Sequence, residues 1–200
     1  RSGSLPVDVN IVEDRTVGPS LGRDSVEQGR TAALIGLAIV MVFMIFFYGL
    51  SGIIADIALT LNLVFVMSIL AGFGGTLTLP GIAGIILTIG MAVDANVLIF
   101  ERIREELDSG KTVRAAVETG YERAFLTIVD ANLTTIITAI VLYQFGTGPI
   151  KGFALTLMVG IISSMFTALF VTRTIFNLIL SRPDTSSISI GKLRIFRNPK

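Results

Sequence analysis

The sequence predicts an all-α membrane protein, a bundle of five transmembrane helices. The first observation is composition: 52% of the 200 residues are hydrophobic and only 16% are charged, against roughly a quarter charged in soluble domains. The second is that five apolar stretches are each long enough to cross a bilayer, which takes about 20 helical residues. The third is that three of the links between them are short and rich in Gly, Pro or Ser, as in tight turns between antiparallel helices.

The segment before the first apolar stretch has a different pattern. Val7, Val9 and Ile11 alternate with Asp8 and Asn10, and a period of two is typical of a half-buried strand. One strand does not make a domain. We therefore expect residues 1–30 to be the extracytoplasmic remnant of a larger domain, a strand and then a linker, and the chain to be a piece of a longer protein.

The five expected helices follow in order and form a transmembrane domain over residues 31–180. Their ranges are 31–49, 54–73, 81–100, 124–145 and 152–180. The links at 50–53, 74–80 and 146–151 are predicted to be tight turns, and residues 101–123 a longer loop. The last helix is long enough to tilt, or to turn along the membrane surface.

The positions of Lys and Arg predict the orientation, because these residues stay on the cytoplasmic side when they lie in short loops. The 101–123 loop contains Arg102, Arg104, Lys111, Arg114 and Arg123, and the tail over residues 181–200 is also basic. Both are therefore expected in the cytoplasm. An odd number of spans then places the N-terminal end of the chain outside.

Two copies of one tripeptide lie inside apolar stretches, Asp94-Ala95-Asn96 and Asp130-Ala131-Asn132. An ionised aspartate at the centre of a helix in lipid costs roughly 2.5–3.5 kcal/mol on insertion scales, and burial favours its neutral form. The chain has no histidine, the side chain that usually titrates near neutral pH. Asp94 and Asp130 are therefore predicted to transfer protons. The alternative is that both acids only hydrogen-bond neighbouring helices together.

The two aspartates are expected at the same depth in the membrane. Asp94 lies six residues before Phe100, and Asp130 lies six residues after Ala124. In antiparallel helices both carboxyls then lie roughly 9 Å from the inner ends of their spans. If they approach each other, one shared proton is the favoured state.

Polar residues near the two acids are candidates for a supporting role. Thr127 and Thr134 share a helical face with Asp130, and their hydroxyls either serve the acid, by bonding it or by holding waters, or only pack. Asn96 and Asn132 point away from their acids. We expect these two amides to bond between helices.

An acidic stripe continues from Asp94 toward the cytoplasm through Glu101, Glu105 and Asp108. It is either an exit path for protons or a solvated helix end. The second interpretation is favoured because two basic residues in this stretch lie four positions before an acid, as in the pairs Arg102 with Glu106 and Arg104 with Asp108.

Small residues recur at every fourth position of the last stretch, which allows close approach of helix backbones in lipid. The set begins with Gly152, Thr156, Gly160 and Ser164. Gly84, Thr88 and Ala92 form a shorter version on the third stretch. We predict tight helix packing at both.

The sequence shows no pattern of enzymatic chemistry. It lacks cysteine, a phosphate-binding glycine loop, a nucleophile with its base, and a metal-ligand cluster. We therefore expect no enzyme activity, no cofactor and no metal. The surroundings implied by the composition are the lipid bilayer, with no nucleic acid.

Three segments resemble one family. The run from Gly90 to Leu107, GMAVDANVLIFERIREEL, is similar to a signature of the SecD family, and so are DRTVGPSLG at Asp14–Gly22 and FGTGPIKGF at Phe145–Phe153. SecD is an accessory subunit of the bacterial Sec translocon, and it resembles half of an RND-type transporter membrane domain, with SecF as the other half. The resemblance implies multi-pass insertion in the bacterial inner membrane and use of the proton-motive force downstream of SecYEG. It also associates proton passage with the acid that matches Asp94.

The family pattern includes an earlier transmembrane helix and a large extracytoplasmic domain that grips exported proteins, and neither is present in this sequence. The expectation is therefore the energy-coupling membrane portion of such a subunit. Protonation of Asp94 would change helix packing, and the first span would relay that change to the outer domain. The alternatives are an RND-type exporter of small molecules or lipids and a non-transporting membrane scaffold.

Overall fold

Seven helical elements make up the chain in the computed structural model, which describes residues 19–73 and 78–181. In order they are α1 (Pro19–Tyr48), α2 (Leu50–Gly72), α3 (Leu79–Asp108), α4 (Val113–Phe145), α5 (Gly148–Phe166), the π-helical turn η1 (Thr167–Val171) and α6 (Thr172–Leu180). Five helices are long and apolar enough to cross a membrane, counting the run from Gly148 to Leu180 as one. The predicted fold class, an all-α bundle of five spans, is confirmed.

Several expected boundaries are wrong. The turns expected at 50–53 and 146–151 lie largely in helices, because α2 begins at Leu50 and α5 begins at Gly148. Helix α1 already begins at Pro19, so the second half of the expected linker is helical, while the expected strand lies outside the described residues. The expected loop at 101–123 is also mostly helical, since α3 continues to Asp108 and α4 starts at Val113. The end of an apolar stretch therefore does not mark the end of the helix. Beyond it, ion pairs along and between the helices support the helical backbone.

Local sequence explains the short connections. Gly49 alone joins α1 to α2, and its φ of 57° lies in the left-handed region that glycine adopts without strain. Thr78 caps α3 by accepting a hydrogen bond from the Gly81 backbone N–H at 3.2 Å, and Pro80 lies in the first turn. Gly110, at φ 90°, makes the turn between α3 and α4 possible. The chain can therefore reverse direction within a few residues.

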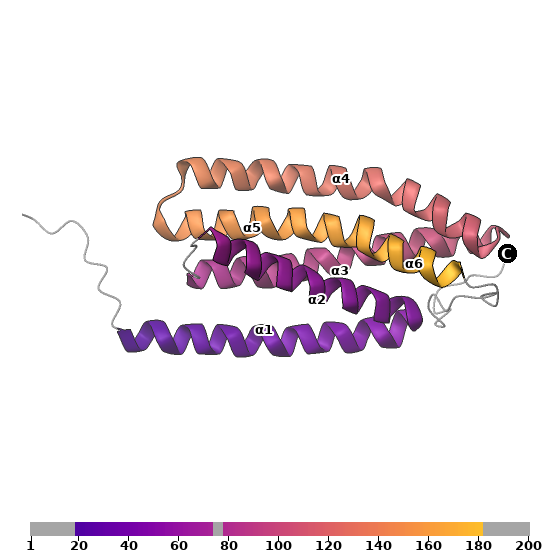
Figure 1. Ribbon diagram of the computed structural model, residues 1–200. Helices are drawn as coiled ribbons and strands as arrows, with labels where there is room; N and C mark the ends of the chain where they lie inside the picture. The colour runs from indigo at the N-terminus through magenta and orange to yellow at the C-terminus, as the bar shows by residue number, and fades with distance from the viewer. Residues whose placement is uncertain (1–18, 74–77, 182–200) are drawn as a thin grey trace, which may run out of the picture.

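Helices α1 and α4 lie at opposite edges of the bundle, with α2, α3 and α5 between them (Figure 1). The connection between α1 and α2, the turn between α3 and α4, and the last turn of α6 lie at one end of the bundle, which we call the charged end (Figure 1). Aromatic side chains form the core there. Phe100 of α3 packs against Tyr48 of α1 and Phe176 of α6, with ring centroids 5.5 and 5.9 Å apart.

The small residues of α5 face those of α3. A Cβ added at Gly160 would lie 2.4 Å from Thr88 Cγ2, and one added at Gly84 would lie 3.2 Å from Thr156 Cβ. At Gly152 an added Cβ would meet Thr78 Oγ1 at 2.7 Å. Ser164 on the same stripe is buried. The two stripes therefore bring the backbones of α3 and α5 together in the centre of the bundle.

Candidate functional site

Asp94 lies on an exposed face of α3, beside a small recess that α3 forms with α4. The recess has a volume of about 60 Å³ and is lined on α3 by Asp94, Ala95 and Leu98, and on α4 by Ile128, Ala131 and Asn132. Its walls are therefore mostly apolar, with one carboxyl and one amide facing the same space.

Asp130 does not share this recess. It is exposed on α4, and no hydrogen bond or recess lining among the described residues joins its carboxyl to that of Asp94. The residue that α4 brings to Asp94 is Asn132. The structure therefore places the two acids on neighbouring helices without bringing them together in one recess.

Neither acid is buried by the five helices, which differs from the buried acids that the apolar stretches suggested. A hydropathy pattern shows that a residue lies at membrane depth, but the side of the helix that it occupies depends on tertiary packing. For Asp94 and Asp130 that side is the open surface of the bundle. A low-dielectric environment at these carboxyls would have to come from lipid or from another subunit.

The two asparagines are buried, but their amides do not bond across helices as expected. Asn96 Nδ2 donates to the Ala92 carbonyl at 3.1 Å, and Asn132 Nδ2 donates to the Ile128 carbonyl at 2.8 Å. Both acceptors lie four residues earlier in the same helix. Asn96 Oδ1 is buried without a hydrogen-bond partner in the described part of the chain, so this amide retains an unused acceptor in the core.

Thr134, near Asp130, turns its hydroxyl to the helix backbone. Thr134 Oγ1 donates to the carbonyl oxygens of Asp130 and Ala131 at 3.0 and 3.2 Å. Thr127 and Thr134 are both exposed. Thr134 therefore satisfies its own donor and does not hold the Asp130 carboxyl in this state.

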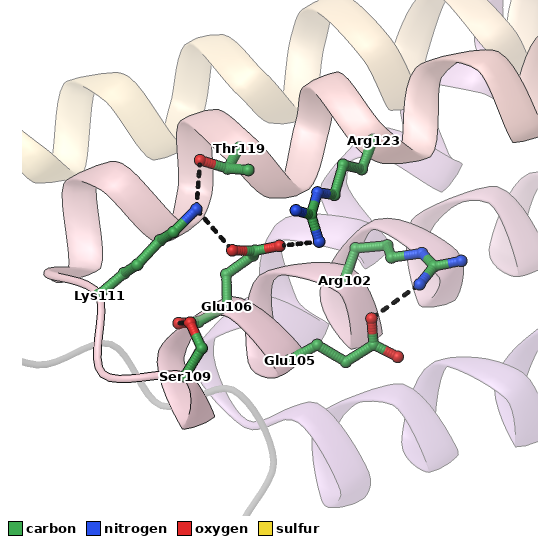
Figure 2. Close-up of polar contacts among 7 residues, drawn as sticks. All are labelled: Arg102, Glu105, Glu106, Ser109, Lys111, Thr119 and Arg123. Carbon is green, nitrogen blue, oxygen red and sulfur yellow. Dashed lines mark hydrogen bonds and ion pairs between the residues drawn. The ribbon is translucent and has the colours of Figure 1, made fainter.

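Beyond Phe100, where the apolar stretch of α3 ends, Glu106 forms the strongest charge cluster of the described residues. Its carboxylate oxygens lie 2.7 Å from Lys111 Nζ and 2.6 Å from Arg123 Nη1, and the Lys111 ammonium also donates to Thr119 (Figure 2). The hydrogen bond from Lys111 and the charges of Arg123, Lys111 and Arg102 lower the pKa of Glu106, although burial opposes them. These ion pairs connect α3 to α4 and to the turn between the two helices.

The expected pairs of Arg102 with Glu106 and of Arg104 with Asp108 are therefore wrong. Arg102 pairs with Glu105 at 2.8 Å, and Arg104 pairs with Glu101 at 3.3 Å, three positions apart in each case. Spacing alone did not reveal that α4 supplies Arg123 to Glu106. Glu101 also accepts a hydrogen bond from the Tyr48 hydroxyl of α1 at 3.2 Å. The acidic stripe is thus largely a paired helix end.

Sequence reasoning missed Asp56 of α2. Its side chain is only 5% exposed, and neither carboxyl oxygen has a hydrogen-bond partner within the described ranges. The signal was the same as for Asp94, an acid inside an apolar stretch. Asp56 belongs to no repeated tripeptide, so it did not stand out in the sequence. Asn62, another polar residue of the same apolar stretch, is buried as well.

The described residues contain no group of three or more acidic or His side chains placed to hold a metal ion. The carboxyl contacts that the structure shows in those ranges are ion pairs and hydrogen bonds.

Comparisons with known proteins agree on one family. The family model described as "Protein export membrane protein SecD/SecF, C-terminal" matches residues 3–182. The chain is 62% identical over 190 residues to "Protein translocase subunit SecD" of Desulfurispirillum indicum, covering 95% of this chain and 37% of that protein. For the protein of the same name in Rhodothermus marinus the identity is 61% over 183 residues, covering 91% and 29%.

Solved structures give the same result. The crystal structure of SecDF from Thermus thermophilus, described as a translocon-associated membrane protein, matches with a TM-score of 0.80 and 42% identity over 84% of this chain and 23% of that one. A second SecDF crystal structure, in a super-membrane-facing form, matches with a TM-score of 0.78 and 43% identity over 92% and 25%. The chain thus spans well under half the length of these relatives. It belongs to the SecD/SecF C-terminal family of protein export membrane proteins.

Proposed function

We propose that this chain is the proton-driven membrane portion of a SecD-type subunit that assists protein export. Asp94 carries the proposal, because it is an acid at membrane depth in a recess that also holds Asn132 and is open at the surface of the bundle. Such a carboxyl can exchange a proton with water entering from one side and present either charge state to a neighbouring helix. Its neutral and charged forms would then favour different packing.

The proposed surroundings are those of the relatives. SecF would supply the second half of an RND-type membrane domain, SecYEG would deliver the exported protein, and a larger extracytoplasmic domain would hold it. The chain would lie in the bacterial cytoplasmic membrane with its N-terminal end outside. The basic residues at the charged end, among them Arg102, Arg104 and Arg123, support this orientation. The role is mechanical and not enzymatic.

The decisive experiment replaces Asp94 with Asn in the full-length subunit. Asn keeps the size of the side chain but holds no exchangeable charge, so stimulation of protein translocation by the proton-motive force should be lost in inverted membrane vesicles. Assembly with the partner subunits should persist. Asp108→Asn is the matched control, because Asp108 is an exposed acid at the charged end of the same helix, and it should leave stimulation unchanged.

Three other results would contradict the proposal. Normal stimulation by the proton-motive force in Asp94→Asn would remove the energetic role. Normal secretion together with normal assembly in that variant would indicate a scaffold. Transport of a small molecule or lipid by the subunit without SecF would indicate an exporter.

A further inference from the structure

Asp56 differs from every other carboxyl that the structure describes. Two carboxyl side chains in those ranges are buried, Asp56 at 5% exposure and Glu106 at 4%. Glu106 has Lys111 and Arg123 as partners, whereas Oδ1 and Oδ2 of Asp56 have no hydrogen-bond partner. Only the Asp56 backbone carbonyl is engaged, by the Thr60 hydroxyl at 2.8 Å. A buried carboxylate with no partner is strongly disfavoured, so the neutral acid fits this position.

The Asp56 side chain lies on the face of α2 that meets α1. Gly52 is four residues earlier, and residues at that spacing share a helical face. A Cβ added at Gly52 would lie 2.0 Å from the Met44 carbonyl oxygen of α1. This face of α2 therefore packs directly on α1. Residues 32–47 of α1 are all apolar, so α1 has no group there that can pair with a carboxylate.

The other helices near α2 do not supply a partner either. On α3, Asp94 lines the recess shared with α4, and Glu101 bonds Tyr48 and Arg104. Residues 152–172 of α5, η1 and the start of α6 include no titratable side chain. Arg173 lies against the Tyr121 ring, 5.9 Å from its centroid. Within residues 19–73 and 78–181 no group is placed to pair with a charged Asp56, so its ionisation would need removal of α1 or entry of water beside it.

Asp56 also lies at the depth of Asp94. Asp56 is six residues from Leu50 at the start of α2, and Asp94 is six residues from Phe100 in α3. Tyr48, beside the Gly49 turn, packs against Phe100 with ring centroids 5.5 Å apart, so the two starting points lie at one level. At 1.5 Å per residue both acids are about 9 Å from that level. They therefore lie at the same distance from the charged end on different sides of the bundle core.

We propose that Asp56 is a second proton-binding site, protonated while α1 lies against α2 and able to release its proton only when α1 moves away. The site and its gating by α1 stand on the packing around Asp56. Only their use to drive export rests on the proposed function. Asp94 would exchange protons at the open surface, and Asp56 would couple a proton to the position of α1.

The test measures the protonation of Asp56 and the position of α1 in the same full-length protein in lipid vesicles. Infrared difference spectra against Asp56→Asn identify the carbonyl stretch of the protonated Asp56 carboxyl. Spin labels on cysteines at Ile39 of α1 and Ile57 of α2, in a background without other cysteines, report the distance between the helices. Both positions are exposed, at 64% and 46%, and lie at similar distances from Gly49.

We expect the Asp56 band to be present at neutral pH and to disappear at alkaline pH while the distance between the labels increases. In Asp56→Asn the distance should stay short at every pH, because the amide mimics the protonated acid. Asp56→Glu should shift the band and keep the coupling, which gives a second variant if the amide fails to fold. Asp94→Asn should leave the Asp56 band intact, because Asp94 lines the recess between α3 and α4.

Any one of three results would overturn the inference: an ionised Asp56 at neutral pH with α1 in place, loss of the band without a change in distance, or a band that persists at every pH at which the protein stays folded. These outcomes are separate from the test of Asp94. If Asp94→Asn abolishes stimulated translocation while Asp56 fails to titrate, only this second site is wrong. If Asp56 behaves as expected while Asp94→Asn translocates normally, the proposed function is wrong.

Discussion

The carboxyl groups of this chain differ in what surrounds them, and that difference assigns their roles. Glu106 is buried between two cations, Asp56 is buried with none, and Asp94 and Asp130 lie on the open surface at membrane depth. A paired carboxylate is held in its charged form, whereas an unpaired buried one favours the neutral form. Glu106 is therefore a structural residue, and the proton exchange that we propose is placed at Asp94 and Asp56.

Replacing Glu106 with Gln should destabilise the hairpin of α3 and α4. The change removes the carboxylate that Lys111 and Arg123 both contact and leaves two cations close together (Figure 2). We expect a lower midpoint of thermal unfolding in detergent. Glu105→Gln is the matched control, because it breaks the ion pair with Arg102 in which both side chains are about half exposed or more, and such pairs contribute little. Equal midpoints for the two variants would contradict the structural role of Glu106.

The contribution of Glu106 should depend on pH in one direction. Because Lys111 and Arg123 lower its pKa in the folded state, the stabilisation is complete above the ordinary glutamate pKa of about 4.3. It is lost as the pH falls from that value through the lower pKa of the folded protein. We therefore expect the difference in unfolding midpoint between the parent and Glu106→Gln to be constant from neutral pH to about pH 5. The difference should shrink at more acidic pH, and a difference that grows there would contradict the pairing.

At the scale of helices, the sequence predicted those contacts that have a local pattern. The small residues from Gly152 to Ser164 recur every four positions, and α5 does pack them against α3. The positions of the spans followed from hydropathy in the same way. Contacts that depend on another helix gave no such pattern: Arg123 of α4 pairs with Glu106 of α3, and α1 packs on Gly52, one turn before Asp56. Whether an aspartate in an apolar stretch faces the inside or the surface of the bundle also depends on packing.

The packing of α1 on α2 should be sensitive to one added methyl group. In Gly52→Ala the new Cβ would lie 2.0 Å from the backbone oxygen of Met44, so α1 must shift. We expect a loss of about 1–3 kcal/mol in the free energy of unfolding, as for other overpacked cores. Gly36→Ala on α1 is the control, since nothing lies within 4 Å of its added Cβ, and its stability should be unchanged or slightly higher. Unfolding in mixed micelles measures both, and equal stability would contradict the close approach.

At the scale of the whole molecule, the bundle has an open side where a membrane domain would usually be closed. Helices α1 and α4 form the two edges of the bundle (Figure 1). Only 11% of the residues in the most apolar 18-residue stretch of α1 are buried, and 17% in that of α4. Asp94 of α3 and Asp130 of α4 are both exposed on the surface of the bundle. Exposed acids at membrane depth are costly in lipid. A second subunit on the α3 and α4 side would lower that cost by supplying hydrogen-bond donors or a counter-charge, as in half of a two-part transporter.

The recess beside Asp94 should therefore be protected when SecF is present. Ala131 lines that recess and is exposed in this chain, so a cysteine there should react readily with a lipid-soluble maleimide in the isolated subunit. We expect co-assembly with SecF to slow the reaction several-fold if, as we propose, the partner covers the surface between α3 and α4. A cysteine at Ile39, which is 64% exposed on α1 at the opposite edge, should react at the same rate with and without SecF. If both cysteines are protected equally, the partner encloses the whole bundle. If neither is protected, Asp94 faces lipid alone and its counter-charge must come from elsewhere.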